Sequence, residues 1–139
     1  MKTWLYYFGK PRDARLNALA AEFVQRADRL APVKMVEATW GRFDPWTRHP
    51  AGRVILLDPG GKAVDSAAVA KTLRAADETG RELVFVVGPH HGYTPEWRQR
   101  AHELWSLSPL TFSHEIARLL LAEQIFRAWA TLRNHPYVR

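Results

Sequence analysis

Hydrophobic residues are arranged along this chain as short continuous runs that alternate with longer segments of helical spacing. Four apolar runs, bounded by glycine, proline or charged residues, predict β-strands at 3–8, 33–38, 54–58 and 83–87. The last two are apolar at nearly every position. That pattern is typical of strands buried on both faces of a parallel sheet.

Between these runs, apolar residues recur at every third or fourth position, which predicts helices at 13–30, 65–79 and 94–105. Gly80 follows the second of these segments and Pro95 begins the third, as helix ends and helix starts prefer. The segment 39–53 has no clean period. We therefore expect a loop or an irregular connection there.

The last predicted helix begins after Ser113 and is apolar on most sides. Only a narrow polar stripe interrupts it, formed by Arg118, Glu123, Gln124 and Arg127. We expect this helix to pack against the sheet on one side and against a second subunit on the other. A polar tail follows it at 133–139.

Strands that alternate with helices predict an α/β fold over residues 1–139, built as one domain with a mostly parallel sheet and helices on both faces. In such sheets, ligands bind beyond the carboxyl ends of the strands. Three loops should meet at that edge, at 57–62, 88–93 and 106–112. None of them carries a nucleophile with an obvious base.

Composition favours a polyanionic partner. The chain has 20 Lys and Arg against 14 Asp and Glu, a net charge of +6, which suits nucleic acid, although a merely basic surface explains it equally well. The absence of cysteine excludes disulfides and Cys-based zinc sites. No apolar run approaches the roughly 20 residues of a membrane span, and no signal peptide is visible, so we expect a soluble cytoplasmic protein.

Several short motifs have an ordinary structural explanation beside a functional one. The turn 60–62 looks like part of a phosphate loop, but Ala63 stands where that motif needs Ser or Thr. His90 and His91 could bind a metal, yet no third ligand is near them in sequence, so we predict no metal site. Asp58 could act as a general base or could bond neighbouring backbone amides.

The C-terminal third carries a long and specific set of motifs. These are WSLSPLTFSH at 105–114, RLLLAEQ at 118–124, RAW at 127–129 and NHPY at 134–137. Upstream there are two glycine-bounded turns, Leu57-Asp58 followed by Gly61-Lys62, and Gly88 with Gly92. Together they resemble the RlmH (YbeA) family of small SPOUT-class methyltransferases. The similarity covers most of the chain and is weakest at 39–53, where this chain is shorter.

The resemblance implies a fold, an activity and a cofactor. Members of that family have an α/β sheet whose C-terminal segment passes through a loop to form a trefoil knot, and they pair as homodimers through the knot region. They use S-adenosyl-L-methionine to methylate N3 of a pseudouridine in the 23S RNA of the assembled ribosome. We therefore expect an rRNA methyltransferase whose partners are the ribosome and a second copy of this chain.

The resemblance also assigns candidate site residues by position. The residues implied to hold the cofactor are Leu57, Gly88, Leu107, Ser108, Pro109, Leu110, Thr111 and Phe112. The residues implied to take part in catalysis are Tyr137, His135 and Arg139, and those implied to contact RNA are Arg118, Arg127 and His114. The tail of one subunit is expected to complete the site of the other.

Two functional loops depart from the family pattern. The glycine loop usually reads Gly-Gly-Pro-Glu-Gly, whereas here Pro89 removes a backbone N–H and His91 replaces the carboxylate. In the tail, Val138 replaces a second histidine. These changes keep a second hypothesis open, namely a catalytically impaired or retargeted SPOUT-fold protein that binds RNA or ribosomes.

Overall fold

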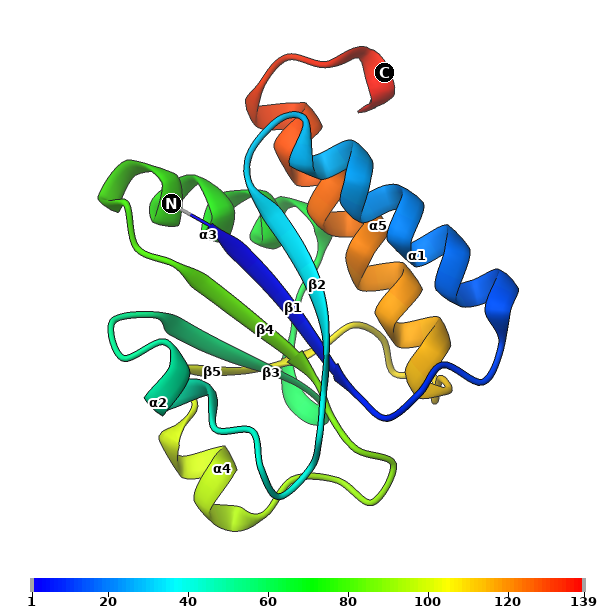
Figure 1. Ribbon diagram of the computed structural model, residues 1–139. Helices are drawn as coiled ribbons and strands as arrows, with labels where there is room; N and C mark the ends of the chain where they lie inside the picture. Colours follow the sequence, from blue (N-terminus) through cyan, green and yellow to red (C-terminus); the bar gives the residue numbers. More distant parts are fainter. Residues whose placement is uncertain (1, 139) are drawn as a thin grey trace.

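A computed structural model describes residues 2–138 and shows a five-stranded, all-parallel sheet with helices on both faces (Figure 1). The strands are β1 (Thr3–Phe8), β2 (Val33–Ala38), β3 (Arg53–Ala63), β4 (Leu83–Val87) and β5 (Glu103–Ser106). They lie side by side in the order β2-β1-β4-β3-β5. The predicted α/β class is confirmed.

The helices divide unequally between the two faces of the sheet. The long helices are α1 (Ala14–Asp28), α3 (Ser66–Thr79) and α5 (His114–Leu132), and together they cover one face (Figure 1). The short helices α2 (Pro45–Arg48) and α4 (Pro95–Arg100) cover the other. A 3-10 turn, Pro136–Val138, follows α5.

Alternation along the strands explains why both faces hold an apolar core. Leu5 and Phe85 are fully buried against α1, α3 and α5, whereas their neighbours Tyr6 and Val86 pack on the side of α2 and α4. Successive residues of a central strand therefore need to be apolar. This accounts for the unbroken hydrophobic runs at β3 and β4.

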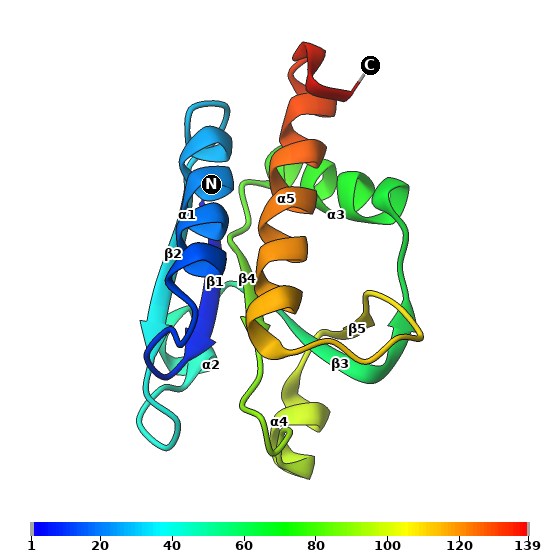
Figure 2. The same cartoon turned by 90° about the vertical axis from the view of Figure 1, so that its right-hand side faces the viewer.

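Helix α5 lies between α1 and α3 (Figure 2), and its apolar surface is mostly covered within the same chain. Leu121, Ile125 and Trp129 have no exposed surface. Two apolar residues of α5 remain well exposed, Ile116 at 40% and Leu120 at 38%. They are the part of the helix available to a second subunit. None of the described helices combines the length and the apolar character that crossing a membrane requires.

The prediction of a helix over 94–105 is wrong in its second half. Helix α4 ends at Arg100, and Leu104 and Trp105 belong to the edge strand β5. Trp105 is buried against the ring of Phe85, with the centroids 5.4 Å apart, while Leu104 packs on the opposite face. Trp97, Leu104 and Trp105 happen to have helical spacing. A four-residue strand is too short to show its own period.

Strand β3 continues past its predicted end at residue 58 and pairs with β5 twice. Leu57 and Lys62 both lie opposite Trp105, so the residues between them bulge out of the ladder. Gly61 allows this return, because a Cβ there would lie 2.5 Å from the carbonyl carbon of Leu104. The turn expected at 60–62 is thus part of strand β3.

The side chain of Glu103 also links β3 to β5 at this bulge. Its carboxylate accepts hydrogen bonds from Lys62 Nζ at 2.8 Å, from Trp105 Nε1 at 3.1 Å and from Arg53 Nη2. Burial raises the pKa of Glu103, but these donors and the charge of Arg53 outweigh it and lower the pKa to about 2. The ionised carboxylate therefore stabilises the pairing of β3 with β5.

The connection 39–52 contains the one-turn helix α2 and is otherwise irregular, as expected. It is tied to the sheet by a buried contact between His49 Nε2 and Tyr6 Oη, 2.7 Å apart. At its start, the indole of Trp40 meets the ring of Phe8 edge to face at 5.2 Å. Two aromatic anchors therefore position a segment that has little regular structure.

Gly61→Ala should lower the free energy of unfolding by about 2–3 kcal/mol, because the new methyl group meets backbone atoms that are fixed by strand pairing. The control is Gly60→Ala, whose Cβ would meet only Asp58 Oδ1, at 3.3 Å, and which should cost less than about 1 kcal/mol. Urea unfolding followed by far-UV circular dichroism measures both. Equal losses would show that the close approach of β3 to β5 is not what constrains residue 61.

Glu103→Gln should lower the free energy of unfolding at pH 7 by about 1–2 kcal/mol, after allowance for the partly exposed cations. The folded pKa of Glu103 lies below its unfolded value of about 4.3, so its contribution is complete above pH 4.3 and is lost as the pH falls towards 2. Urea unfolding at pH 7 and at pH 3 should show the gap between wild type and variant narrowing in acid.

The matched control for Glu103 is Glu96→Gln on α4. The Glu96 side chain is 76% exposed and its partner, Arg100 Nη1, is 3.6 Å away. This variant should follow the wild type at both pH values, since exposed ion pairs contribute little. A Glu103 variant that differs from the wild type by the same amount at pH 7 and pH 3 would contradict the electrostatic explanation.

Candidate functional site

The carboxyl ends of β3, β4 and β5 bring the predicted cofactor segments together. Leu57 on β3 lies opposite both Val87 on β4 and Trp105 on β5. Gly88 and Leu107 therefore leave the sheet from strands that flank Leu57. The sequence predicted that these loops converge, and the structure confirms their convergence.

The segment 107–112 joins β5 to α5 by an irregular path with several bends, and its residues 109–111 are exposed. Ser108 shapes it, because its carbonyl oxygen accepts from Ser106 Oγ at 3.1 Å and its own Oγ accepts from the Leu110 amide at 3.0 Å. In the part of the chain that the structure describes, the other amides of this segment have no protein acceptor. Leu110 is 71% exposed. Free backbone groups beside exposed apolar side chains fit the edge and faces of an adenine ring.

Gly88 is buried, and the space beside its Cα is occupied by Tyr93. A Cβ at this position would lie 2.5 Å from Cζ of the Tyr93 ring. The Tyr93 hydroxyl donates to the carbonyl oxygen of Val86 at 2.8 Å, and burial raises the pKa of Tyr93 well above its usual value. Residue 88 therefore has to be glycine, because the Tyr93 ring, which is bonded to β4, leaves no space for a Cβ. No sequence signal indicated that Tyr93 plays this part.

Asp58 is engaged in holding the β3 bulge. Its Oδ1 accepts from the Gly60 amide at 2.8 Å, and Arg98 Nη2 of α4 lies 3.0 Å from its Oδ2. The side chain is 3% exposed. Of the two alternatives left by the sequence, bonding of neighbouring backbone describes this aspartate.

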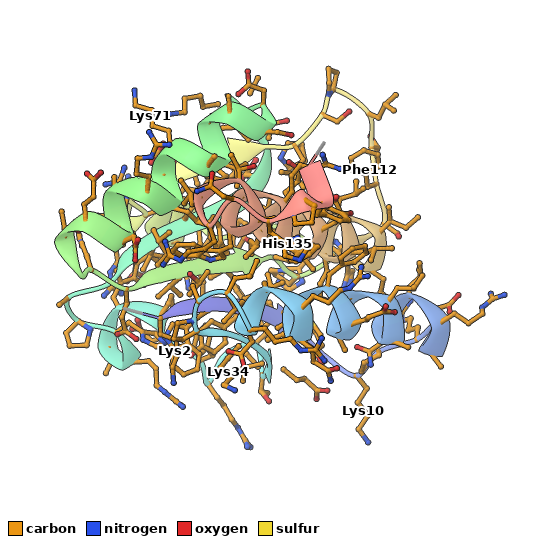
Figure 3. All side chains as sticks on the ribbon, turned by 90° about the horizontal axis from the view of Figure 1, so that it is seen from above. Lys2, Lys10, Lys34, Lys71, Phe112 and His135 are labelled. Atoms are coloured by element: carbon orange, nitrogen blue, oxygen red, sulfur yellow. The ribbon has the colours of Figure 1, made fainter. Side chains whose placement is uncertain are left out.

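Gly88 also borders a cleft of about 740 Å³. The cleft lies at the carboxyl ends of β1, β2 and β4 and at the start of α5. The basic side chains at its rim are those of Lys10 and Arg12, both exposed. Its lining also includes Tyr7, Phe8, Glu37, Trp40, Pro89, His90, His91, His114, Glu115 and Arg118. Figure 3 shows Lys10 towards the same end of the fold as Phe112 and away from Lys2 and Lys71.

The histidines of the cleft come from two separate elements. His90 and His91 belong to the glycine loop, with ring centroids 5.3 Å apart, and His114 begins α5. Burial and the neighbouring His90 lower the pKa of His114, so its imidazole is neutral at pH 7. Among residues 2–138, no group of three or more His, Cys, Asp or Glu side chains is arranged to hold a metal ion.

Arg118 forms an inner wall of the cleft rather than part of an exposed stripe. Its side chain is 2% exposed, and Nη1 donates to Asn17 Oδ1 at 2.8 Å. The guanidinium carbon lies 3.8 Å from the centroid of the Tyr7 ring. Burial lowers the pKa of Arg118 from its high usual value. Of the predicted RNA contacts, His114 and Arg118 therefore line the cleft.

The predicted catalytic tail lies at the far end of α5. The Tyr137 hydroxyl donates to Glu123 Oε2 at 2.7 Å, and Arg127 Nη2 donates to the same oxygen at 2.9 Å. Burial and the bond to Glu123 raise the pKa of Tyr137. His135 packs on the ring of Phe126 at 5.9 Å. Arg139 lies outside the described residues.

Within one chain, the tail and the cofactor segments are far apart. Helix α5 has 19 residues, so its last turn lies roughly 27 Å from His114 at its start. The structure therefore brings Leu57, Gly88 and 107–112 together with His114, but it places Arg127, His135 and Tyr137 elsewhere. A single copy of the chain does not assemble the whole predicted set.

Comparison with known proteins gives one consistent result. Residues 1–137 match a family model described as "Predicted SPOUT methyltransferase". A ribosomal RNA large subunit methyltransferase H from Solibacter usitatus (strain Ellin6076) is 52% identical over 139 residues, covering all of both chains. A protein of the same name from Gloeobacter violaceus (strain ATCC 29082 / PCC 7421) is 35% identical over 150 residues, covering 99% of this chain and 98% of the relative.

The fold also has a counterpart among solved structures. "The structure of a probable methylase family protein from Haemophilus influenzae Rd KW20" superposes with a TM-score of 0.59 at 11% identity, covering 97% of this chain and 67% of that one. At this identity the likeness concerns the fold alone. The full-length matches to curated relatives carry the assignment, and this chain belongs to the RlmH family of SPOUT methyltransferases.

Proposed function

We propose that this chain is an S-adenosyl-L-methionine-dependent methyltransferase that acts on N3 of a pseudouridine in large-subunit ribosomal RNA, on the assembled ribosome. The observation that carries the proposal is the convergence of Leu57, Gly88 and the segment 107–112 at neighbouring strand ends. It occurs in a chain that matches a relative named ribosomal RNA large subunit methyltransferase H over its full length.

The residues at this edge fit the cofactor chemically. The unpaired amides of 107–112 offer hydrogen bonds to adenine, and the exposed Leu110 side chain offers an apolar surface to its ring. Leu57 lies beside this segment, at the end of the regular pairing of β3 with β4. When bound there, S-adenosyl-L-methionine supplies an activated methyl group.

The acceptor nitrogen carries a proton at neutral pH, so a protein group has to receive that proton as the new N–C bond forms. The neutral imidazole of His114 is available at the cleft. The tail residues His135, Tyr137 and Arg139 remain the candidates for orienting the base. The Tyr137 hydroxyl bonds Glu123, which lies nine residues beyond His114 on α5 and therefore about 13.5 Å away along the helix axis, so we infer that the tail acts on the site of a second copy and not on the cleft of its own chain.

A homodimer is the assembly that we infer from this arrangement. Ile116 and Leu120 are four residues apart on α5, so they share one face of the helix, and both are exposed. Isologous pairing of two such faces would place two copies of α5 against each other. We further infer the C-terminal trefoil knot from membership of the family. A ribosomal substrate implies a cytoplasmic location.

The competing proposal, an impaired or retargeted RNA-binding protein, rests on Pro89, His91 and Val138. The first two residues line the cleft, and the His91 ring lies 5.4 Å from that of Trp40, so these two changes alter the cleft. The cofactor segment 107–112 keeps the family motif. Active methyl transfer is therefore the better supported function.

The purified chain should transfer tritiated methyl groups from S-adenosyl-L-methionine to large-subunit RNA of ribosomes that lack the modification. Leu110→Gln should weaken cofactor binding about tenfold without affecting folding, because the side chain is exposed in the free protein. Calorimetric titration with S-adenosyl-L-methionine measures this. The control is Leu19→Gln on α1, which is 46% exposed and should bind as the wild type does.

The two readouts separate the competing proposals. A wild-type chain that binds the cofactor and methylates no ribosomal RNA would favour a changed substrate. A wild-type chain that neither binds the cofactor nor methylates would favour the pure binding protein. Unchanged affinity in the Leu110 variant would remove that side chain from the adenine site.

Leu120→Asp should convert the dimer into a monomer, because two buried carboxylates would face each other across a twofold interface. Light scattering after size-exclusion chromatography measures the mass of the particle. Ala75→Asp, which adds the same charge at an exposed position on α3, is the control and should stay dimeric. A Leu120 variant of unchanged mass would exclude this face of α5 from the interface.

A further inference from the structure

The order of the strands divides the carboxyl edge of the sheet into two halves that share Gly88. Leu57 and the segment 107–112 lie on the side of β3 and β5, whereas the cleft lies on the side of β1 and β2. In a methyl transfer, donor and acceptor atoms have to come into contact. With the donor on one side of Gly88, the cleft on the other side is where an acceptor would meet it.

We propose that this cleft holds the target nucleotide of the RNA, with Trp40 and His91 as a stacking wall for its base and with Lys10 and Arg12 as contacts for its phosphate. The proposal rests on the methyltransferase function proposed above and adds the residues that recognise the acceptor. The volume of about 740 Å³ lies within the range of sites that enclose molecules of this size.

Neighbouring aromatic rings hold Trp40 in place, while Trp40 and His91 both keep some exposed surface. The Trp40 ring contacts Trp97 at 5.0 Å and Phe8 at 5.2 Å, so two neighbours hold its orientation. The His91 ring lies nearly perpendicular to that of Trp40, with the centroids 5.4 Å apart, and the His90 ring lies 5.3 Å from that of His91. Trp40 is only partly buried, and His90 and His91 are exposed. Rings of this kind stack bases of any sequence.

The cations at the rim are free to bind an anion. The side chains of Lys10 and Arg12 are exposed and have no carboxylate partner among residues 2–138. The nearby Glu115 carboxylate is already occupied, since it accepts from the backbone amides of Arg12 at 3.0 Å and Asp13 at 3.1 Å. Glu37 is the other carboxylate that lines the cleft. Unpaired Lys and Arg beside an aromatic wall are typical of single-stranded RNA sites.

Trp40→Ala should lower kcat/KM for ribosomes at least about tenfold, with the affinity for S-adenosyl-L-methionine unchanged, because a lost stacking surface affects only the acceptor. Trp40→Phe keeps a ring and should retain most of the activity. Methyl transfer at varied ribosome concentration and calorimetry with the cofactor give the two readouts. Circular dichroism verifies that each variant is folded.

The double variant Lys10→Ala with Arg12→Ala should raise KM for ribosomes and reduce the dependence of binding on salt concentration, since two phosphate contacts are lost. The control is Lys71→Ala with Arg74→Ala on α3, which removes the same charge. Lys71 lies at the opposite end of the fold from Lys10 (Figure 3). This control should leave both quantities within twofold of the wild type.

Three outcomes would overturn the assignment. The first is kcat/KM within twofold of the wild type in both the Trp40→Ala and the Lys10/Arg12 variants. The second is a Trp40 variant that loses cofactor affinity and keeps its KM for ribosomes, which would place the cofactor in the cleft. The third is an equal effect of the Lys71/Arg74 control, which would show that binding depends on the net charge of the protein and not on the position of Lys10 and Arg12.

Failure of the proposed function would be recognised separately, because the wild type itself would then transfer no methyl group. In that case, fluorescence anisotropy with a labelled fragment of large-subunit RNA at several salt concentrations tests the cleft directly. Weaker binding by the Trp40→Ala and Lys10/Arg12 variants, with binding by the Lys71/Arg74 control unchanged, would support the cleft as an RNA site. Unchanged binding by the first two would reject it.

Discussion

The double pairing of β3 with β5 around Trp105 is the constraint on which the functional edge of this fold depends. It requires a glycine at 61, because the two backbones touch, and an ionised Glu103, because two cations converge there. The junction fixes where β5 ends. The segment 107–112 starts from that point, and it leads directly into α5. The path of the last third of the chain is therefore determined by this backbone contact and by the buried Trp105 at its centre.

The order of the strands gives the carboxyl edge its chemical asymmetry. On one side of β4 there are unpaired backbone amides and exposed apolar residues, and on the other there are a cleft, basic side chains and aromatic rings. Gly88 lies between them, held against its own strand by Tyr93. A parallel sheet offers every strand end at the same edge, so neighbouring loops can take different roles without long connections.

The sequence predicted four of the strands, the three long helices and the convergence of the cofactor loops, because these depend on periodicity and on the rules of parallel sheets. It did not predict β5, whose Leu104 and Trp105 fit helical spacing with Trp97. The return of β3 was also missed, since Pro59-Gly60-Gly61 is typical of a turn until a partner strand is present. Arg118 was expected on a polar stripe, and only its contacts with Asn17 and Tyr7, about a hundred residues away in sequence, explain its burial.

Helix α5 works as a spacer of fixed length between the loop that precedes it and the tail that follows it. One residue inserted in α5 after Glu123 would advance the tail by about 1.5 Å and turn it by about 100° around the axis, so that Tyr137 would lose its partner Glu123. Segment 39–52 is subject to no such restriction, because it is attached to the sheet by a few side chains. Differences in length within the family should therefore be absorbed by that connection, while the number of turns in α5 stays constant.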